Sequence, residues 1–161
     1  MSEALEKYLE AGRIAAKLKD EATRIVKVET SLLEICERLE GLTYRLGGEP
    51  AFPLNIGVDD VTAHYTSPPE DEGRIPEDSI VKIDLGIHIQ GYIADTAITL
   101  TFNPNYEDLA ASTEEALEAA VEAIKPGVKV SQIGAAIEKT INRFGYKPIR
   151  NLMGHRIERY S

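Results

Sequence analysis

The stretch Val81–Phe102 reads VKIDLGIHIQGYIADTAITLTF, and it decides the architecture of the chain. In its first half, apolar side chains alternate with polar or small ones as far as Gln90. Alternation with a period of two predicts a β-strand with one buried face. A second run, rich in β-branched residues, follows Gln90-Gly91. Two such runs joined at a glycine-containing corner predict a β-hairpin.

Two carboxylates lie on this hairpin. With a two-residue turn at the corner, Asp84 lies opposite Ala97, and Asp95 lies opposite Gly86. Residues directly opposite each other project to the same face, and so do residues two apart along a strand. The two aspartates are therefore predicted to be diagonal neighbours on one face, with Cβ atoms ~7–8 Å apart or somewhat less. A four-residue loop would place them directly opposite each other, still on one face.

Carboxylates this close repel each other, so either the pKa of one rises or a cation lies between them. Hard oxygen ligands suit a divalent metal ion. The alternative interpretation is a pair of surface aspartates on a solvated strand face. The polar positions here are few and are interspersed with Gly86 and Ala97, which favours the metal site narrowly.

Composition limits the classes of function. The chain has 161 residues and a net charge of −9, from 27 acidic and 18 basic residues, with no Lys/Arg run. This pattern disfavours binding to nucleic acid or to an anionic membrane surface. No apolar stretch approaches the ~18 residues of a membrane span, and no signal peptide opens the chain, so we expect a cytoplasmic protein. The single cysteine, Cys36, lies in a helical pattern and is expected to be a small buried hydrophobe.

Apolar residues at helical spacing predict helices over about 2–26, 31–46, 106–124 and 131–144. Ser31 is the expected N-cap of the second helix, with Glu34 as its capping-box partner, and Gly47 is its expected stop. The segment 50–69 is irregular, with short extended pieces. His64 lies in it, and a lone histidine is more often structural than functional.

The chain repeats itself at an offset of 98 residues. The matched positions are Lys27/Lys125, Ile35/Ile133, Glu40/Glu138, Arg45/Arg143, Gly47/Gly145 and Pro50/Pro148. The alternative to an internal duplication is a chance match between two amphipathic helices. The match is imperfect, since Glu29 corresponds to Gly127. We interpret the chain as a first pseudo-repeat, about 1–103, and the start of a second, about 104–161. A complete second copy would end near residue 200, so the sequence predicts that a second hairpin is lacking, through fragmentation, degeneration or supply by a partner chain.

Three motifs carry a resemblance to a known family. They are AFPLNIGVDDVTAHYT at 51–66, KIDLGIHIQGYIADTAIT at 82–99 and NLMGHRIERY at 151–160. In this order they resemble the successive signatures of methionine aminopeptidases of the archaeal, or type II, branch. The resemblance implies an α+β pita-bread fold, here incomplete, in which an antiparallel sheet carries helices packed on one face. It also implies removal of the initiator methionine from nascent proteins.

The resemblance further implies two divalent metal ions (Co, Mn, Fe, Ni or Zn), held by two aspartates, a histidine and two glutamates. Asp84, Asp95 and His155 match three of these ligands. His64 of AHYT matches a catalytic histidine that positions the substrate.

The departures from the family pattern concern the same site. Both glutamate ligands fall outside residues 1–161. The isolated chain is therefore expected to be inactive, to bind metal weakly, and to need a carboxy-terminal complementing chain or to associate with itself. Phe52, Pro53 and Ile56 are candidates for the methionine side-chain pocket, although core packing explains them equally well. A non-catalytic protein-binding module and a proline-directed dinuclear peptidase are the alternative functions.

Overall fold

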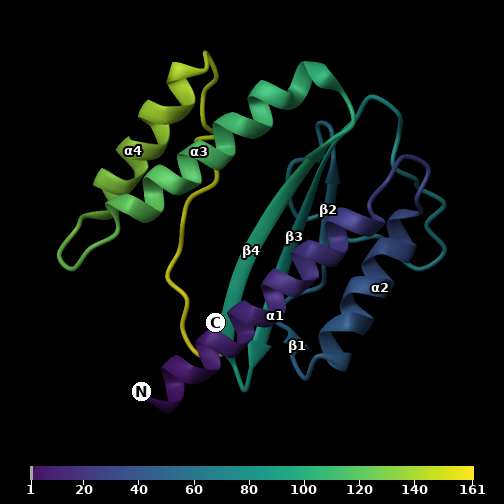
Figure 1. Cartoon of the computed structure of the whole chain (residues 1–161), viewed down its shortest axis with the longest axis horizontal. Helices are drawn as coiled ribbons and strands as arrows, with labels where there is room; N and C mark the ends of the chain where they lie inside the picture. Colours follow the sequence, from purple (N-terminus) through teal and green to yellow (C-terminus); the bar gives the residue numbers. More distant parts are fainter. Residues whose placement is uncertain (1) are drawn as a thin grey trace. The chain divides into compact units, whose positions relative to one another are not determined.

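The computed structural model describes residues 2–161 (Figure 1). Its elements are α1 (Glu3–Ile25), α2 (Leu32–Arg45), β1 (Glu49–Pro50), β2 (Asn55–Val58), β3 (Ile80–Ile89), β4 (Tyr92–Thr101), the short 3₁₀ helix η1 (Pro104–Tyr106), α3 (Glu107–Ala123) and α4 (Val130–Arg143). They form two compact units. The first contains the chain up to Phe102 together with Arg156–Ser161, and the second contains Asn103–His155.

The sheet of the first unit is built around β3, which pairs antiparallel with β4 on one side and with β1 and β2 on the other. Gln90 and Gly91 form the turn, both with positive φ, at 51° and 86°. Asp84 lies opposite Ala97, and Gly86 lies opposite Asp95, so the predicted register is confirmed. Residues 103–155 contain the 3₁₀ helix and two α-helices and no strand.

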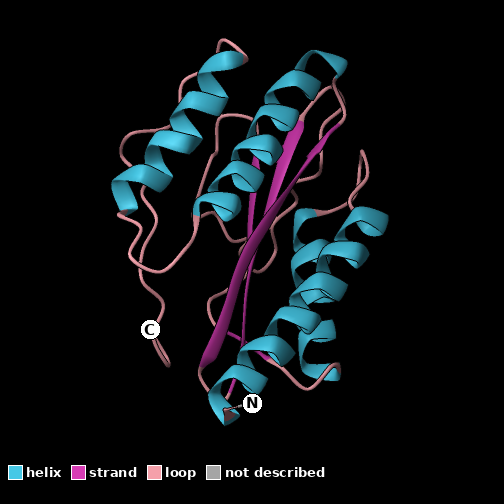
Figure 2. Ribbon diagram, turned by 60° about the vertical axis from the view of Figure 1, so that its left-hand side comes forward, coloured by secondary structure: helices cyan, strands magenta, loops and turns pink. Residues whose placement is uncertain are grey.

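One face of this sheet is covered by helices. Figure 2 shows α1 lying along the long strands of the hairpin, and α2 packs on α1 and beside the short strands β1 and β2. The alternate residues of β3 that point to this side are buried, and with the helix stripes they form the core. Its fully buried large side chains include Leu18, Ile35, Leu39, Ile56, Ile75, Ile83 and Ile87. Burial of these side chains, at ~1.5–3 kcal/mol each, is the main favourable contribution to the folding of this unit.

Local capping sets the ends of α2. The Ser31 hydroxyl accepts a hydrogen bond from the Glu34 backbone N–H at 3.3 Å. After Arg45 the chain reverses at Gly47, whose φ of 86° suits a residue without a side chain. The N-cap and the stop predicted from the sequence are both confirmed.

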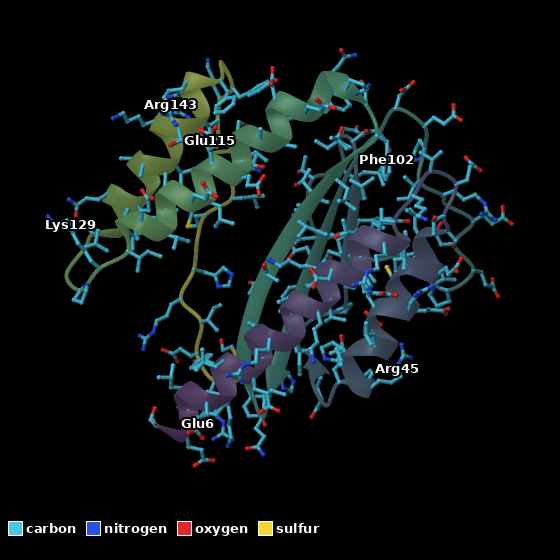
Figure 3. The ribbon with its side chains drawn as sticks, viewed as in Figure 1. Glu6, Arg45, Phe102, Glu115, Lys129 and Arg143 are labelled. Atoms are coloured by element: carbon cyan, nitrogen blue, oxygen red, sulfur yellow. The ribbon has the colours of Figure 1, made fainter. Side chains whose placement is uncertain are left out.

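The second unit is a pair of helices. α3 and α4 pack through small and apolar side chains, among them Ser112, Ala116 and Ile141. An exposed ion pair joins Arg143 of α4 to Glu115 of α3 at 3.2 Å (Figure 3). Across residues 2–161, no helix has the length and apolarity needed to cross a membrane.

Candidate metal-binding face

The face of the sheet opposite the helices carries the candidate ligands. On β3 this face presents Lys82, Asp84, Gly86 and His88, because Val81 and its alternate neighbours point into the core. The cross-strand partners of Asp84 are Asn55 on β2 and Ala97 on β4; the partner of Gly86 is Asp95. The structure therefore brings both aspartates to one face as diagonal neighbours.

Asp84 is only partly accessible and has a cationic neighbour. Its side chain is 21% exposed, and its Oδ2 lies 3.5 Å from the Nζ of Lys82, which is 31% exposed. The ammonium group supplies one positive charge next to a face that carries two carboxylates. Sequence reasoning missed Lys82, although its position two residues before Asp84 places it on the same strand face.

Phe52 also lies on this face. A Cβ added at Gly86 would clash with the Phe52 ring, so the ring occupies the space above that glycine. Since Gly86 lies directly opposite Asp95, an apolar ring stands beside the carboxylate pair. Of the other pocket candidates, Pro53 is exposed, and Ile56 is fully buried on the core face opposite Ile83. Core packing accounts for Ile56, so we do not keep it as a pocket residue.

His64 lies in the loop after β2, exposed and with a positive φ of 60°. The loop is attached to β2 beside it, because the Tyr65 carbonyl accepts a hydrogen bond from Ile56 N–H at 2.7 Å. The Thr66 hydroxyl lies 3.4 Å from Oδ1 of Asn55, the strand partner of Asp84. The loop that carries His64 is thus fixed to the strand next to the first aspartate.

Asp71 holds the far end of this loop. Its carboxylate accepts hydrogen bonds from the Ser67 hydroxyl at 2.6 Å, the Gly73 N–H at 2.8 Å and the Tyr65 hydroxyl at 3.1 Å. The Ser67 hydrogen bond is the main reason that the pKa of Asp71 is lowered. The same carboxylate raises the pKa of the Tyr65 hydroxyl, which donates to it. Sequence reasoning did not find this cluster, because its partners are turn residues without a periodic pattern.

Asp84, Asp95 and His155 are the candidate ligands for a divalent metal ion. Two carboxylates on one sheet face, of which Asp84 is partly buried and Asp95 is exposed, fit a hard cation. Among residues 2–161, however, no three His, Cys, Asp or Glu side chains are grouped so that they could hold a metal ion. His155 is the last residue of the second unit, whereas both aspartates belong to the first. The face therefore supplies part of a metal site rather than a complete one.

Comparison with known proteins identifies the class. The sequence pattern of metallopeptidase family M24 matches residues 6–160, and the chain belongs to this family. A methionine aminopeptidase of Pyrococcus horikoshii is 46% identical over 157 residues, which are 98% of this chain and 53% of that protein. The chain thus spans about half the length of several curated relatives that it matches.

Solved structures show the same fold. A methionine aminopeptidase from Thermotoga maritima matches 99% of this chain and 68% of its own, with a TM-score of 0.91 and 25% identity. A prolidase from Pyrococcus furiosus matches 91% of this chain and 44% of its own, with a TM-score of 0.78 and 26% identity. The α+β pita-bread architecture, with its antiparallel sheet and helices, is therefore present over the part of the fold that this chain covers.

Proposed function

We propose that this chain provides the first half of a methionine aminopeptidase site, which hydrolyses the bond after the N-terminal methionine of nascent proteins in the cytoplasm. The observation that carries the proposal is the pair Asp84 and Asp95 on one sheet face of an M24 chain. The names of the archaeal relatives and their identity of 42–47% support the choice of substrate.

Each residue has a proposed task. Asp84 and Asp95 are carboxylate ligands, and His155 adds an imidazole. When bound, divalent ions supply Lewis acidity and an activated water near neutral pH. His64 holds the substrate and donates a hydrogen bond to the carbonyl oxygen that becomes negatively charged. Phe52, with a contribution from Pro53, forms an apolar wall for the methionine side chain.

The isolated chain is proposed to be inactive. Its sheet face offers two carboxylates and one counter-charge from Lys82, and the two further glutamates implied by the family resemblance are not among residues 1–161. Titration calorimetry tests this point. Weak binding of Co²⁺ or Mn²⁺ is expected, and submicromolar binding of two ions per chain would contradict the proposal.

Complementation is the decisive experiment. The chain is mixed with the carboxy-terminal half of an archaeal methionine aminopeptidase, and the release of methionine from a Met-Ala-Ser peptide is measured with added Co²⁺. Release is expected from the mixture and from neither part alone, and a chelator should abolish it. Self-association through the edge of β4 that faces away from β3 is the competing arrangement, and sedimentation measures it directly.

Matched variants locate the activity. Asp84→Asn and Asp95→Asn are expected to abolish release, whereas Thr99→Ala, an exposed change on the same face, is expected to leave it intact. The absence of three grouped ligands in residues 2–161 favours the second candidate, a non-catalytic partner-binding module. A stable complex that never releases methionine would favour that candidate.

A further inference from the structure

The backbone of His64 lies in an uncommon conformation. Its φ is 60°, in the left-handed region that residues with a side chain seldom adopt, and the residue is exposed. Such a conformation persists only where the neighbouring structure holds it. The contacts of the residues that follow His64 therefore decide how firmly this backbone conformation is kept.

Tyr65, the next residue, is fixed by three different contacts. Its carbonyl oxygen accepts a hydrogen bond from the Ile56 N–H at 2.7 Å, and its ring packs against the core. Its hydroxyl donates a hydrogen bond to Oδ2 of Asp71 at 3.1 Å. Because adjacent Cα atoms are only ~3.8 Å apart, fixing Tyr65 also fixes the point at which His64 joins it.

Asp71 is itself held in place. Its Oδ2 also accepts a hydrogen bond from the Ser67 hydroxyl at 2.6 Å, and its Oδ1 accepts one from the Gly73 N–H at 2.8 Å. A Cβ at Gly73 would lie 2.9 Å from Oδ1 of Asp71 and 3.0 Å from Cδ1 of Leu32, so a side chain there would disturb both. The Gly73 carbonyl accepts from the Leu32 N–H at 2.9 Å, which attaches Asp71 to the start of α2.

A continuous series of contacts thus runs from α2 through Gly73, Asp71 and Tyr65 to His64. All of these residues belong to the first unit. The hydrogen bond to Asp71 raises the pKa of the Tyr65 hydroxyl, which therefore keeps its proton and remains a donor at neutral pH. This bond is the side-chain contact of the series that lies nearest to His64, and removing one oxygen atom from Tyr65 breaks it.

We propose that Tyr65 and Asp71 are positioning residues for His64, and that the hydrogen bond between them keeps the His64 backbone in its left-handed conformation beside β2. The proposal rests on the proposed role of His64 in holding the substrate. Tyr65 and Asp71 act through His64 and not on the substrate. Breaking the bond leaves the loop attached to β2 through the Tyr65 carbonyl, but it releases the Tyr65 side chain and lets His64 leave its conformation.

NMR relaxation of the ¹⁵N-labelled whole chain tests this directly. Tyr65→Phe removes the hydroxyl oxygen and keeps the ring, and Tyr44→Phe makes the same change at an exposed tyrosine of α2. The backbone order parameter of His64 should be about 0.85 in wild type and in Tyr44→Phe, and should fall below about 0.6 in Tyr65→Phe. The order parameter of Ile56, buried in β2, should be the same in all three proteins.

Asp71→Ala removes the acceptor instead of the donor. It should lower the order parameter of His64 at least as much as Tyr65→Phe does, because Ser67 and Gly73 lose their acceptor as well. A His64 backbone that stays as rigid as in wild type in either variant would overturn the proposal.

The complemented enzyme provides a second readout. With the carboxy-terminal half and Co²⁺ present, Tyr65→Phe should lower kcat for methionine release from the Met-Ala-Ser peptide by about tenfold. This is part of the ~100-fold or more that loss of a donor to a developing oxyanion costs. In a His64→Ala background, Tyr65→Phe should have no further effect, and Tyr44→Phe should leave release unchanged in both backgrounds. A tenfold loss that persists without His64 would overturn the proposal.

Failure of the proposed function has a different signature. If the wild-type mixture never releases methionine while Tyr65→Phe and Asp71→Ala mobilise His64, the proposed function is wrong and the positioning of His64 stands. If the mixture releases methionine and His64 stays rigid in both variants, the proposed function stands and the positioning proposal is wrong.

Discussion

The two helix pairs of this chain can be compared residue by residue. α2 spans Leu32–Arg45 and α4 spans Val130–Arg143, so both ends are displaced by the same 98 positions. α1 and α3 also end 98 positions apart, at Ile25 and Ala123. The first turns are joined to equivalent cap positions by different hydrogen bonds: the Glu34 N–H donates to the Ser31 hydroxyl, whereas the Lys129 N–H donates to the side-chain oxygen of Gln132.

The burial of the two pairs differs. Leu32 at the start of α2 is 8% exposed, whereas its counterpart Val130 is 77% exposed. On α3, Leu117 and Val121 are also exposed, at 63% and 60%. The first pair packs against a sheet, and residues 103–155, all of which the structure describes, contain no strand. Helix boundaries thus follow from local caps and periodicity, whereas burial requires a tertiary partner.

The largest expected effect comes from truncating one core residue in each pair. Leu39→Ala in α2 removes a side chain that is 0% exposed, and it should destabilise the protein by about 2–5 kcal/mol. Ile137→Ala, the counterpart in α4, removes a half-buried side chain and should cost about 1 kcal/mol. Urea denaturation followed by circular dichroism measures both. Equal losses would mean that the second pair is packed as tightly as the first.

The reactivity of a thiol also distinguishes the buried helix α2 from the more exposed helix α4. Burial raises the pKa of the Cys36 thiol to about 11. At pH 8 this should slow its alkylation by ~100-fold relative to a free thiol, because only the thiolate reacts. Gly134 is the counterpart in α4 and is exposed, so Gly134→Cys in a Cys36→Ala background should react at the free-thiol rate. The reaction with a maleimide, followed by mass spectrometry, provides both rates.

The same thiol makes stability depend on pH. Its folded-state pKa lies above the unfolded value, so its contribution is complete below about pH 8.5 and is lost as the pH rises towards 11. Cys36→Ala should show a smaller fall in melting temperature across this interval than wild type. An identical fall in both proteins would show that another group is responsible.

Several of these features were predictable from the sequence, and others were not. The register of Asp84 and Asp95 follows from a period of two and a glycine-containing turn, and the ends of α2 follow from Ser31 and Gly47. The pairing of Lys82 with Asp84, the position of Phe52 above Gly86 and the contact of Tyr160 with the turn at Gly91 were not predicted. Each of these contacts forms only once the sheet has folded, and no local sequence pattern predicts it.

The turns that join the two helices of each pair can be compared in the same way. Glu29 has a φ of 66°, and its counterpart Gly127 has a φ of 83°. For a residue with a side chain, this left-handed conformation costs roughly 1–2 kcal/mol of conformational free energy. Gly127→Glu should therefore destabilise the protein by about that amount, and Glu29→Gly should stabilise it by about 0.5–1 kcal/mol after the entropic cost of glycine.

Thermal unfolding of the two exchange variants measures this difference. Glu29→Ala is the control, since it changes the side chain but keeps the strained backbone, and it should be nearly neutral. Glu29 N–H also donates to the Ile75 carbonyl at 2.8 Å, and Glu29→Gly preserves this bond. If Glu29→Gly is destabilising, the side chain of Glu29 contributes more than its backbone conformation costs.

The smallest expected effects come from surface ion pairs, one in each unit. Arg38 donates two hydrogen bonds to Oε1 of Glu21, at 3.0 and 2.6 Å, between α2 and α1. Arg143 makes a single 3.2 Å contact with Glu115 between α4 and α3.

Exposed ion pairs contribute about 0.2–1 kcal/mol to stability, and two hydrogen bonds from one guanidinium favour the upper end of this interval. Glu21→Gln should therefore cost more than Glu115→Gln, and 0.5 M salt should reduce both losses. A larger loss for Glu115→Gln would show that the α3–α4 pair depends more on its ion pair than the α1–α2 pair does.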